Sequence, residues 1–328
     1  MRAVVHDTAG PTMAERPDPP AVFGEIVVEM SRVLLRASDH ASESRRRGAL
    51  GIPGSCLVGR DPNRGLVAID PVLPCGRCTH CASGLAAACP QRTVIGGRGR
   101  DGGLAERVAV PEANLHPLPA ELDPDLATLA VPVGIGLALA RRLRLAEAAH
   151  LSVIGDGIAA LAAAAALSTR HPATRLLSDD PFTAGLAAKW SLKHRGLAEA
   201  GRRHDQEALA IFSSSSEALA IAAGMLRPRG RVAWCVDGVA PNAEGLDRLR
   251  WIEGELLGHA TTSIAEALSL LTRPPFDPAP LLRRRIELAE AVIALSTGRP
   301  ADLDGTLVAI GEGSRRERGA PSAGIAAR

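Results

Sequence analysis

The chain has 328 residues, of which 46% are hydrophobic and 23% are charged, and its formal net charge is +2. This composition is typical of a globular protein built as one large domain or two smaller ones. So small a net charge gives no reason to expect nucleic acid or an anionic membrane as a partner. The absence of tyrosine excludes any role that needs a phenol, as an acid or as a stacking platform.

The apolar residues form neither a membrane span nor an export signal. The longest apolar run, residues 158–167, is about half the length that a bilayer-spanning helix requires. The N-terminal MRAVVHDTAG lacks the apolar region of a signal peptide, so a reducing, cytoplasmic location is expected. There, the six cysteines are expected to be thiols or metal ligands before disulfides.

The first third of the chain is rich in strand and turn signals. Short runs of β-branched and apolar residues, separated by glycine and proline, predict strands at residues 3–5, 25–30, 65–71 and 105–110. A cysteine-rich segment lies between the last two strands.

Beyond about residue 119 the pattern changes to alternating strands and helices. The expected strands are residues 151–154, 175–178, 208–212 and 231–236. The expected helices are residues 126–145, 158–167, 184–192, 217–226 and 281–295. This alternation predicts an α/β fold with a doubly wound parallel sheet. A last strand is expected at residues 305–310, followed by a disordered tail at 311–328.

Four cysteines form a C-x2-C-x2-C-x7-C motif: Cys75, Cys78, Cys81 and Cys89. Two-residue spacers let neighbouring thiolates converge on one ion, and a fourth closes a tetrahedron. Four thiolates leave no position for water, so the motif predicts one structural zinc. Ordinary thiols, disulfides and iron–sulfur ligation are the alternatives.

A glycine turn follows the strand at residues 151–154 and opens a helix. The pattern Gly155-x-Gly157-x-x-Ala160 allows a tight turn, a close approach to a pyrophosphate and close helix–strand packing. Asp179, after the next expected strand, is placed to accept hydrogen bonds from the adenosine ribose. Because Asp179 and Asp180 would repel a 2′-phosphate, the sequence favours NAD over NADP. A plain turn before a buried helix is the alternative.

With these motifs in order, the chain resembles the medium-chain zinc alcohol and polyol dehydrogenases. Residues 68–90 are similar to that family's structural zinc lobe, residues 102–106 to its G-G-x-A-E strand, and residues 226–232 to a turn in its cofactor domain. The resemblance implies a GroES-like catalytic domain from residues 1–120 and 272–310, with its zinc lobe at 75–89. It also implies a Rossmann domain at residues 121–271, and a homodimer or homotetramer.

The resemblance fails at the catalytic zinc. The family's first ligand position falls on Arg36, or on Leu35 if the alignment shifts by one residue. Its G-H-E motif is replaced by G-S-C at residues 54–56, and its third ligand by Val131. Arginine and valine cannot bind zinc, so the catalytic zinc is expected to be absent.

Other residues would then have to polarise the substrate. Ser38 and His40 fall where the family has its hydroxyl and imidazole proton relay, and Arg36 is placed to stabilise an oxyanion or an anionic substrate group. The alternative is that these residues line a relic pocket.

The sequence therefore predicts an NAD(P)-dependent oxidoreductase that transfers hydride between nicotinamide and a small alcohol, carbonyl or activated double bond without catalytic zinc. A catalytically inactive relative that binds nucleotide or a protein partner is the second hypothesis. A quinone-reductase-like enzyme is a third, and it fits the cysteine motif poorly.

Overall fold

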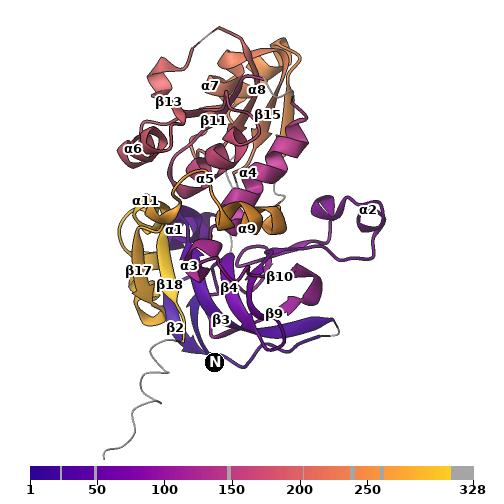
Figure 1. Cartoon of the computed structure of the whole chain (residues 1–328), viewed down its shortest axis with the longest axis vertical. Helices are drawn as coiled ribbons and strands as arrows, with labels where there is room; N and C mark the ends of the chain where they lie inside the picture. Colours follow the sequence, from indigo (N-terminus) through magenta and orange to yellow (C-terminus); the bar gives the residue numbers. More distant parts are fainter. Residues whose placement is uncertain are drawn as a thin grey trace, which may run out of the picture.

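The computed structural model describes residues 1–22, 24–47, 50–145, 149–201, 203–236, 241–258 and 262–311. These residues form a β-rich part and an α/β part. In Figure 1 the β-rich part is at the bottom and the α/β part is at the top. The tail expected to be disordered lies outside the described residues from position 312 onward.

The β-rich part is organised around a seven-stranded sheet in the order β10-β5-β4-β3-β18-β17, with β9 also paired to β3. Its strands are β3 (Glu25–Leu35), β4 (Cys56–Asp61), β5 (Gly65–Ile69), β9 (Arg107–Pro111), β10 (Leu115–Pro117), β17 (Arg284–Glu287) and β18 (Thr306–Ala309). Residues from both ends of the chain therefore share one sheet, because β18 pairs antiparallel with β3. A separate hairpin joins β1 (Arg2–His6) and β2 (Pro11–Glu15), and a small sheet joins β6 (Val72–Leu73), β7 (Thr93–Ile95) and β8 (Gly99–Arg100).

The α/β part contains a six-stranded sheet in which every pairing is parallel. Its strands are β11 (Leu151–Ile154), β12 (Arg175–Leu177), β13 (Lys193–Arg195), β14 (Gln206–Ile211), β15 (Leu226–Trp234) and β16 (Glu255–Gly258). Their order, β13-β12-β11-β14-β15-β16, is the 3-2-1-4-5-6 order of a Rossmann fold. All four residues of β11 are buried, as expected of a central parallel strand covered on both faces.

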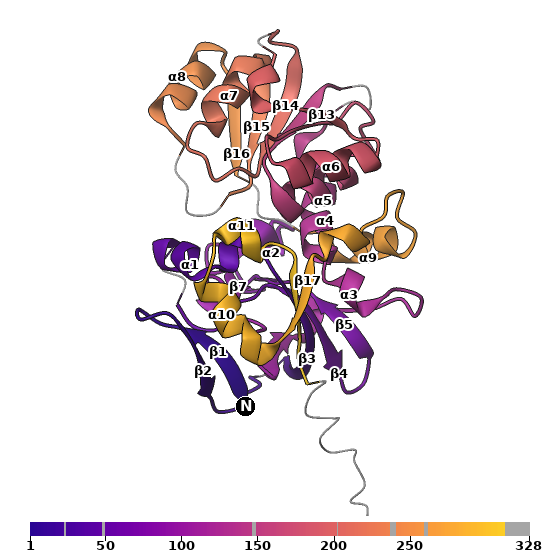
Figure 2. The same ribbon diagram turned by 90° about the vertical axis from the view of Figure 1, so that its left-hand side faces the viewer.

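Helices cover the parallel sheet and connect it to the β-rich part (Figures 1 and 2). The α-helices of the two parts together are α1 (Ala41–Arg47), α2 (Thr79–Ala82), α3 (Pro124–Ala127), α4 (Ala130–Leu143), α5 (Gly157–Ser168), α6 (Pro181–Lys189), α7 (Ala218–Met225), α8 (Ala243–Trp251), α9 (Ile264–Thr272), α10 (Ala291–Ser296) and α11 (Pro300–Leu303), within the residues that the structure describes. Alanine dominates the inside of α5, and residues Ala162–Ala166 are almost wholly buried. A helix that is apolar all round is a buried helix, and α5 packs closely on α4.

One contiguous hydrophobic core joins the two parts. Leu34 and Val58 of the β-rich sheet belong to the same buried cluster as Val153 and Leu161 of the α/β part. Among the residues described, no helix combines the length and the apolar character needed to cross a bilayer.

The expected strands and helices are present with two differences. The helix expected at 126–145 is two helices, α3 and α4. The helix expected at 281–295 is wrong over its first half, where β17 pairs in parallel with β18 and buries Ile286. Pairing with a strand distant in sequence overrides the local helical pattern there.

Candidate active site and zinc lobe

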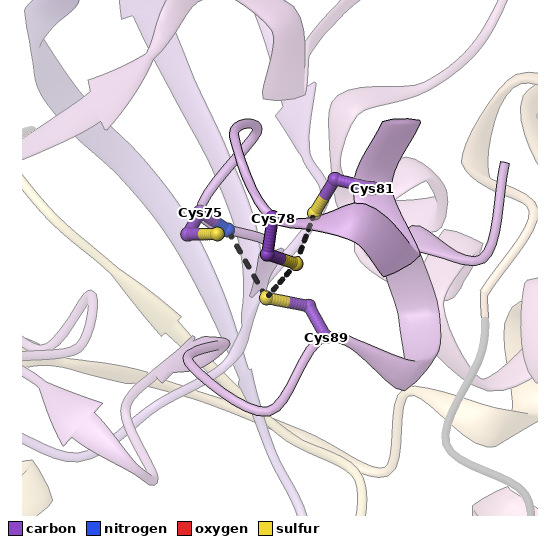
Figure 3. Close-up of side chains that lie close together, drawn as sticks. All are labelled: Cys75, Cys78, Cys81 and Cys89. Atoms are coloured by element: carbon purple, nitrogen blue, oxygen red, sulfur yellow. Dashed lines mark hydrogen bonds between the residues drawn. The ribbon is translucent and has the colours of Figure 1, made fainter. Parts of the chain in front are cut away.

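The four cysteines of the motif converge in a lobe that projects from the β-rich part (Figures 1 and 3). Their ligand atoms all lie within 4.8 Å of one another, and all four are free thiols. The Sγ atom of Cys78 lies 3.5 Å from that of Cys81 and 3.8 Å from that of Cys89. Zn–S bonds of about 2.3 Å in a tetrahedron place the sulfur atoms about 3.8 Å apart. The lobe therefore fits one structural zinc.

The local backbone explains why these sulfur atoms meet. Gly76 and Gly84 have φ of +72° and +77°, in the left-handed region that glycine adopts without strain, so the chain turns sharply between ligands. Cys78 and Cys81 flank the first turn of α2, while Cys89 ends the following 3-10 helix. Backbone N–H groups, that of Arg77 above all, lower the pKa of Cys75 to about 6, and desolvation raises the pKa of Cys81 to about 12. A dication would release the remaining protons, because zinc binds thiolates.

The glycine turn lies between β11 and α5, at the carboxyl edge of the parallel sheet. Its φ angles are +148° at Gly155 and +73° at Gly157. A Cβ atom on Gly155 would come within 2.9 Å of the Phe212 backbone, at the end of the neighbouring β14. Ala160 is fully buried, as close packing of α5 requires. This is the switch point of the strand order, where Rossmann folds bind dinucleotides.

Asp179 lies just past the end of β12, as the sequence predicts for a ribose acceptor. It is exposed, and its Oδ1 atom accepts a hydrogen bond from the backbone N–H of Leu197 at 2.8 Å. The next residue, Asp180, caps α6 by accepting from the N–H of Thr183 at 2.8 Å. The two adjacent carboxylates thus have different roles, and Asp179 is the one that faces solvent.

Arg36 directly follows β3. Its side chain connects two segments that are expected, from the sequence, to correspond to the positions of the family's catalytic zinc ligands. Its Nη2 donates to Oγ of Ser55 at 2.7 Å, and its backbone N–H donates to Asp39 Oδ2 at 2.9 Å. Leu35, the alternative alignment for the first ligand position, is completely buried in the core. The guanidinium of Arg36 therefore lies beside Ser55, the residue that the sequence is expected to carry in place of the family's histidine ligand.

Cys56, next to Ser55, is a buried thiol. Its side chain is completely buried, and this burial raises its pKa to about 11 although Arg36 acts in the opposite direction. One thiol alone does not form a zinc site, because zinc in proteins requires three or four ligands.

His40 is buried immediately after the same turn. Only 6% of it is exposed, and its Nδ1 lies 2.8 Å from Oγ of Ser42. Its Nε2 is buried and makes no hydrogen bond within the part of the chain that the structure describes. Ser38 lies half-buried on the 3-10 helix η1 (Ala37–Asp39) between Arg36 and His40. Ser42, whose hydroxyl contacts His40, is not among the residues predicted from the sequence. The signal that could have found it is its position two residues after His40.

Asp304 connects this turn with the glycine turn. Its Oδ1 accepts from the N–H of Ala37 at 3.3 Å, and its Oδ2 accepts from the N–H of Ile158 at 2.7 Å. Burial raises the pKa of Asp304, while the two N–H groups and the charge of Arg36 oppose that shift. No local sequence pattern marks Asp304, which comes from the far end of the chain. The glycine turn and sheet topology fit a dinucleotide, whereas the N–H of Ile158 in the first turn of α5 is bound by this carboxyl group.

Comparisons with known proteins agree with this fold. Residues 62–120 match the model of the alcohol dehydrogenase GroES-like domain. The chain is 39% identical over 100 residues to an L-galactonate-5-dehydrogenase of Escherichia coli K12, a match that covers 30% of the chain and 28% of that protein. It is 23% identical over 209 residues to a sorbitol dehydrogenase of Bacillus subtilis, covering 58% of the chain and 59% of that protein. The chain therefore matches well under two thirds of the length of these relatives.

Solved structures resemble the chain over nearly its whole length. A putative zinc-binding dehydrogenase from Sinorhizobium meliloti 1021, bound to NADP, has a TM-score of 0.78 and 19% identity, and the match covers 94% of this chain and 98% of that one. Galactitol-1-phosphate dehydrogenase from Escherichia coli has a TM-score of 0.77 and 20% identity, with 94% and 99% covered. These define a GroES-like domain combined with a Rossmann domain. The chain therefore has the fold of these dehydrogenases, and its residues 62–120 match the alcohol dehydrogenase GroES-like domain.

Proposed function

We propose that the chain is an NAD(P)-dependent oxidoreductase that acts on an alcohol or carbonyl group of a small molecule without a catalytic zinc. The observation that carries the proposal is the contact between Arg36 Nη2 and Ser55 Oγ at 2.7 Å. It supplies a permanent cation among residues aligned with the family's catalytic metal ligands. When bound, the nicotinamide supplies or accepts the hydride.

The residues of the chain would supply the remaining chemistry. Arg36 stabilises negative charge on the substrate oxygen, because preorganised donors act strongly in a buried site. His40 exchanges a proton with the substrate through Nε2, which is buried and has no hydrogen bond within the described residues. Ser42 fixes the ring through Nδ1, and Ser38 remains the second hydroxyl candidate.

Arginine at this position favours an anionic or polyhydroxylated substrate. The proteins named above include a dehydrogenase of a sugar acid and one of a polyol phosphate. For the cofactor, Gly155, Gly157 and Ala160 form the phosphate turn, and Asp179 favours NAD over NADP. We place the GroES-like domain at residues 1–120 and 272–310 and the Rossmann domain at 121–271. A cytoplasmic location and a homodimer or homotetramer complete the proposal.

The test is a turnover screen monitored at the nicotinamide absorbance. The purified chain is incubated with NAD or NADH and a panel of polyols, sugar acids, sugar phosphates and their carbonyl forms. Turnover should persist after chelation that leaves the four-cysteine zinc in place. Activity that appears only on adding excess zinc would contradict the proposed role of Arg36.

A binding protein without catalysis is the second candidate. The observation that favours it is Asp304, whose carboxyl group binds the N–H of Ile158 in the first turn of α5. Dinucleotide binding without turnover on the whole panel would support this candidate.

A further inference from the structure

The N-terminus of α5 is already occupied by an acidic group of the chain itself. Asp304 Oδ2 accepts a hydrogen bond from the N–H of Ile158 at 2.7 Å, and the two residues are separated by 146 positions. Asp304 is 9% exposed and follows α11, which Figure 2 shows at the boundary between the β-rich and α/β parts. The carboxyl group thus reaches from one part of the molecule to the first turn of a helix in the other.

This helix end is an anion-binding position by its own chemistry. The first N–H groups of a helix lack intrahelical partners, and the helix dipole adds partial positive charge there. Gly157 N–H is taken by Thr183 Oγ1 at 3.0 Å, and Ile158 N–H by Asp304. A Cβ atom built on Gly157 would lie 2.2 Å from Asp304 Oδ2, so this carboxyl group fills the space beside the turn.

A second group of contacts, made by Arg283, lies at the same boundary. The guanidinium carbon of Arg283 lies 4.7 Å from the ring centroid of Phe182, in the first turn of α6. The same guanidinium donates from Nη1 to the carbonyl oxygen of Ala301 at 3.1 Å, in α11. Arg283 therefore contacts the first turn of α6, and Asp304 contacts the first turn of α5.

We propose that Asp304 is an intramolecular mimic of the cofactor's pyrophosphate, which a dinucleotide must displace from the N-terminus of α5. This inference rests on the proposed function, since it concerns the same cofactor site. Two anions cannot share the Ile158 N–H, so the carboxylate and the pyrophosphate compete for it. Displacement also takes the acceptor Oδ1 away from the N–H of Ala37.

The test compares dinucleotide affinity in three forms of the full chain. Wild type, Asp304→Asn and Asp302→Asn are titrated with NADH by fluorescence and with ADP-ribose by calorimetry. Asp302 is a matched control: it lies two positions away, is exposed on α11 and pairs with Arg299 at 3.2 Å. Removing a competing anion from a charge-assisted site should tighten both ligands by about 10- to 100-fold in Asp304→Asn. Asp302→Asn should match wild type within about twofold, as a surface ion pair contributes little.

Two results would overturn the proposal in different ways. Equal, measurable affinities in wild type and Asp304→Asn would remove the mimic and leave the proposed cofactor in place. No binding of NADH or ADP-ribose to any folded form would remove the proposed function itself, and the mimic with it. Thermal unfolding and zinc content establish that each form is folded.

Hydrogen exchange on the wild type gives an independent readout that needs no variant. Saturating ADP-ribose should increase exchange at the Ala37 amide, which loses Asp304 Oδ1, while Ile158 stays protected because phosphate replaces the carboxylate. Unchanged exchange at Ala37 under saturation would show that Asp304 stays in place, and would contradict the proposal.

Discussion

Nη2 of Arg36 donates a hydrogen bond to Oγ of Ser55 at 2.7 Å, which joins the end of β3 to the residue just before β4. From the sequence, both positions are expected to align with catalytic metal ligands of the zinc dehydrogenases that the chain resembles. The side chain of Cys56, beside them, is kept protonated by burial. The chain therefore combines an arginine cation with a buried, protonated thiol at this site. In this respect the candidate active site differs in chemistry from the zinc lobe, whose four sulfur atoms lie in ligating geometry.

The zinc content should reflect that difference. Purified protein is expected to contain about one zinc per chain, held by the four thiolates. Serine in place of Cys89, the buried ligand, should lower the zinc content and the unfolding temperature together, whereas Cys235→Ser should change neither zinc content nor metal affinity. Elemental analysis that finds two zinc ions per chain would contradict the assignment of an empty catalytic position.

Alanine substitution should have opposite effects on the stability of the fold at two glycines, one in α4 and one in α6. A Cβ atom on Gly136 would come within 2.7 Å of the Ala163 backbone, so Gly136→Ala should destabilise the fold by about 1–3 kcal/mol through overpacking. Gly185 is exposed within α6 with no neighbour within 4 Å of a new Cβ, so Gly185→Ala should stabilise it by about 0.5–1 kcal/mol. Denaturant unfolding measures both. Equal effects at the two sites would show that α4 and α5 are not in close contact.

Much of this fold could be predicted from local sequence, because its main signals are short-range. The cysteine spacing, the glycine turn and the apolar strand at Leu151–Ile154 each act within a few residues. The contacts that define the candidate site are long-range. Asp304 meets Ile158 across 146 positions and Ala37 across 267, and no local pattern marks it. The strand Arg284–Glu287 was missed for the same reason, since its partner β18 is a separate segment.

Alkaline pH should weaken the fold through Cys56. Burial raises its pKa from 9.0 to about 11, so the native state keeps a proton that the unfolded chain loses above pH 9. The stabilisation is complete below pH 9 and is lost as the pH rises toward 11, by up to about 3 kcal/mol. The chain has no tyrosine to titrate in this range. Unfolding of wild type and Cys56→Ala between pH 8 and 11 should show a shallower decline in the variant; parallel curves would contradict the assignment.

Cofactor choice should depend on Asp179. Its carboxylate is exposed at the end of β12, where it would accept from the ribose and repel a 2′-phosphate. Asp179→Ser should weaken NAD binding and raise the affinity for NADP relative to NAD. Asp205→Ser, which removes an exposed carboxylate before β14, is the charge-matched control and should leave the ratio unchanged. A wild type that already prefers NADP would show that Asp179 does not face the ribose.

The last prediction concerns the chemistry of Arg36 and His40. If Arg36 stabilises the developing oxyanion, Arg36→Leu should reduce kcat by about 10²–10³-fold, the typical loss for one such donor. His40→Gln should reduce it by about 10²–10⁴-fold if Nε2 exchanges the proton. Arg60→Leu, an exposed arginine on β4, is the control and should leave kcat unchanged. Cofactor affinity should change little in all three variants, since all three substitutions lie outside the proposed cofactor residues Gly155, Gly157, Ala160 and Asp179. Full activity in both Arg36→Leu and His40→Gln would place the chemistry elsewhere. A loss in Arg36→Leu that lysine at position 36 restores would show that a positive charge at this position is what the reaction requires.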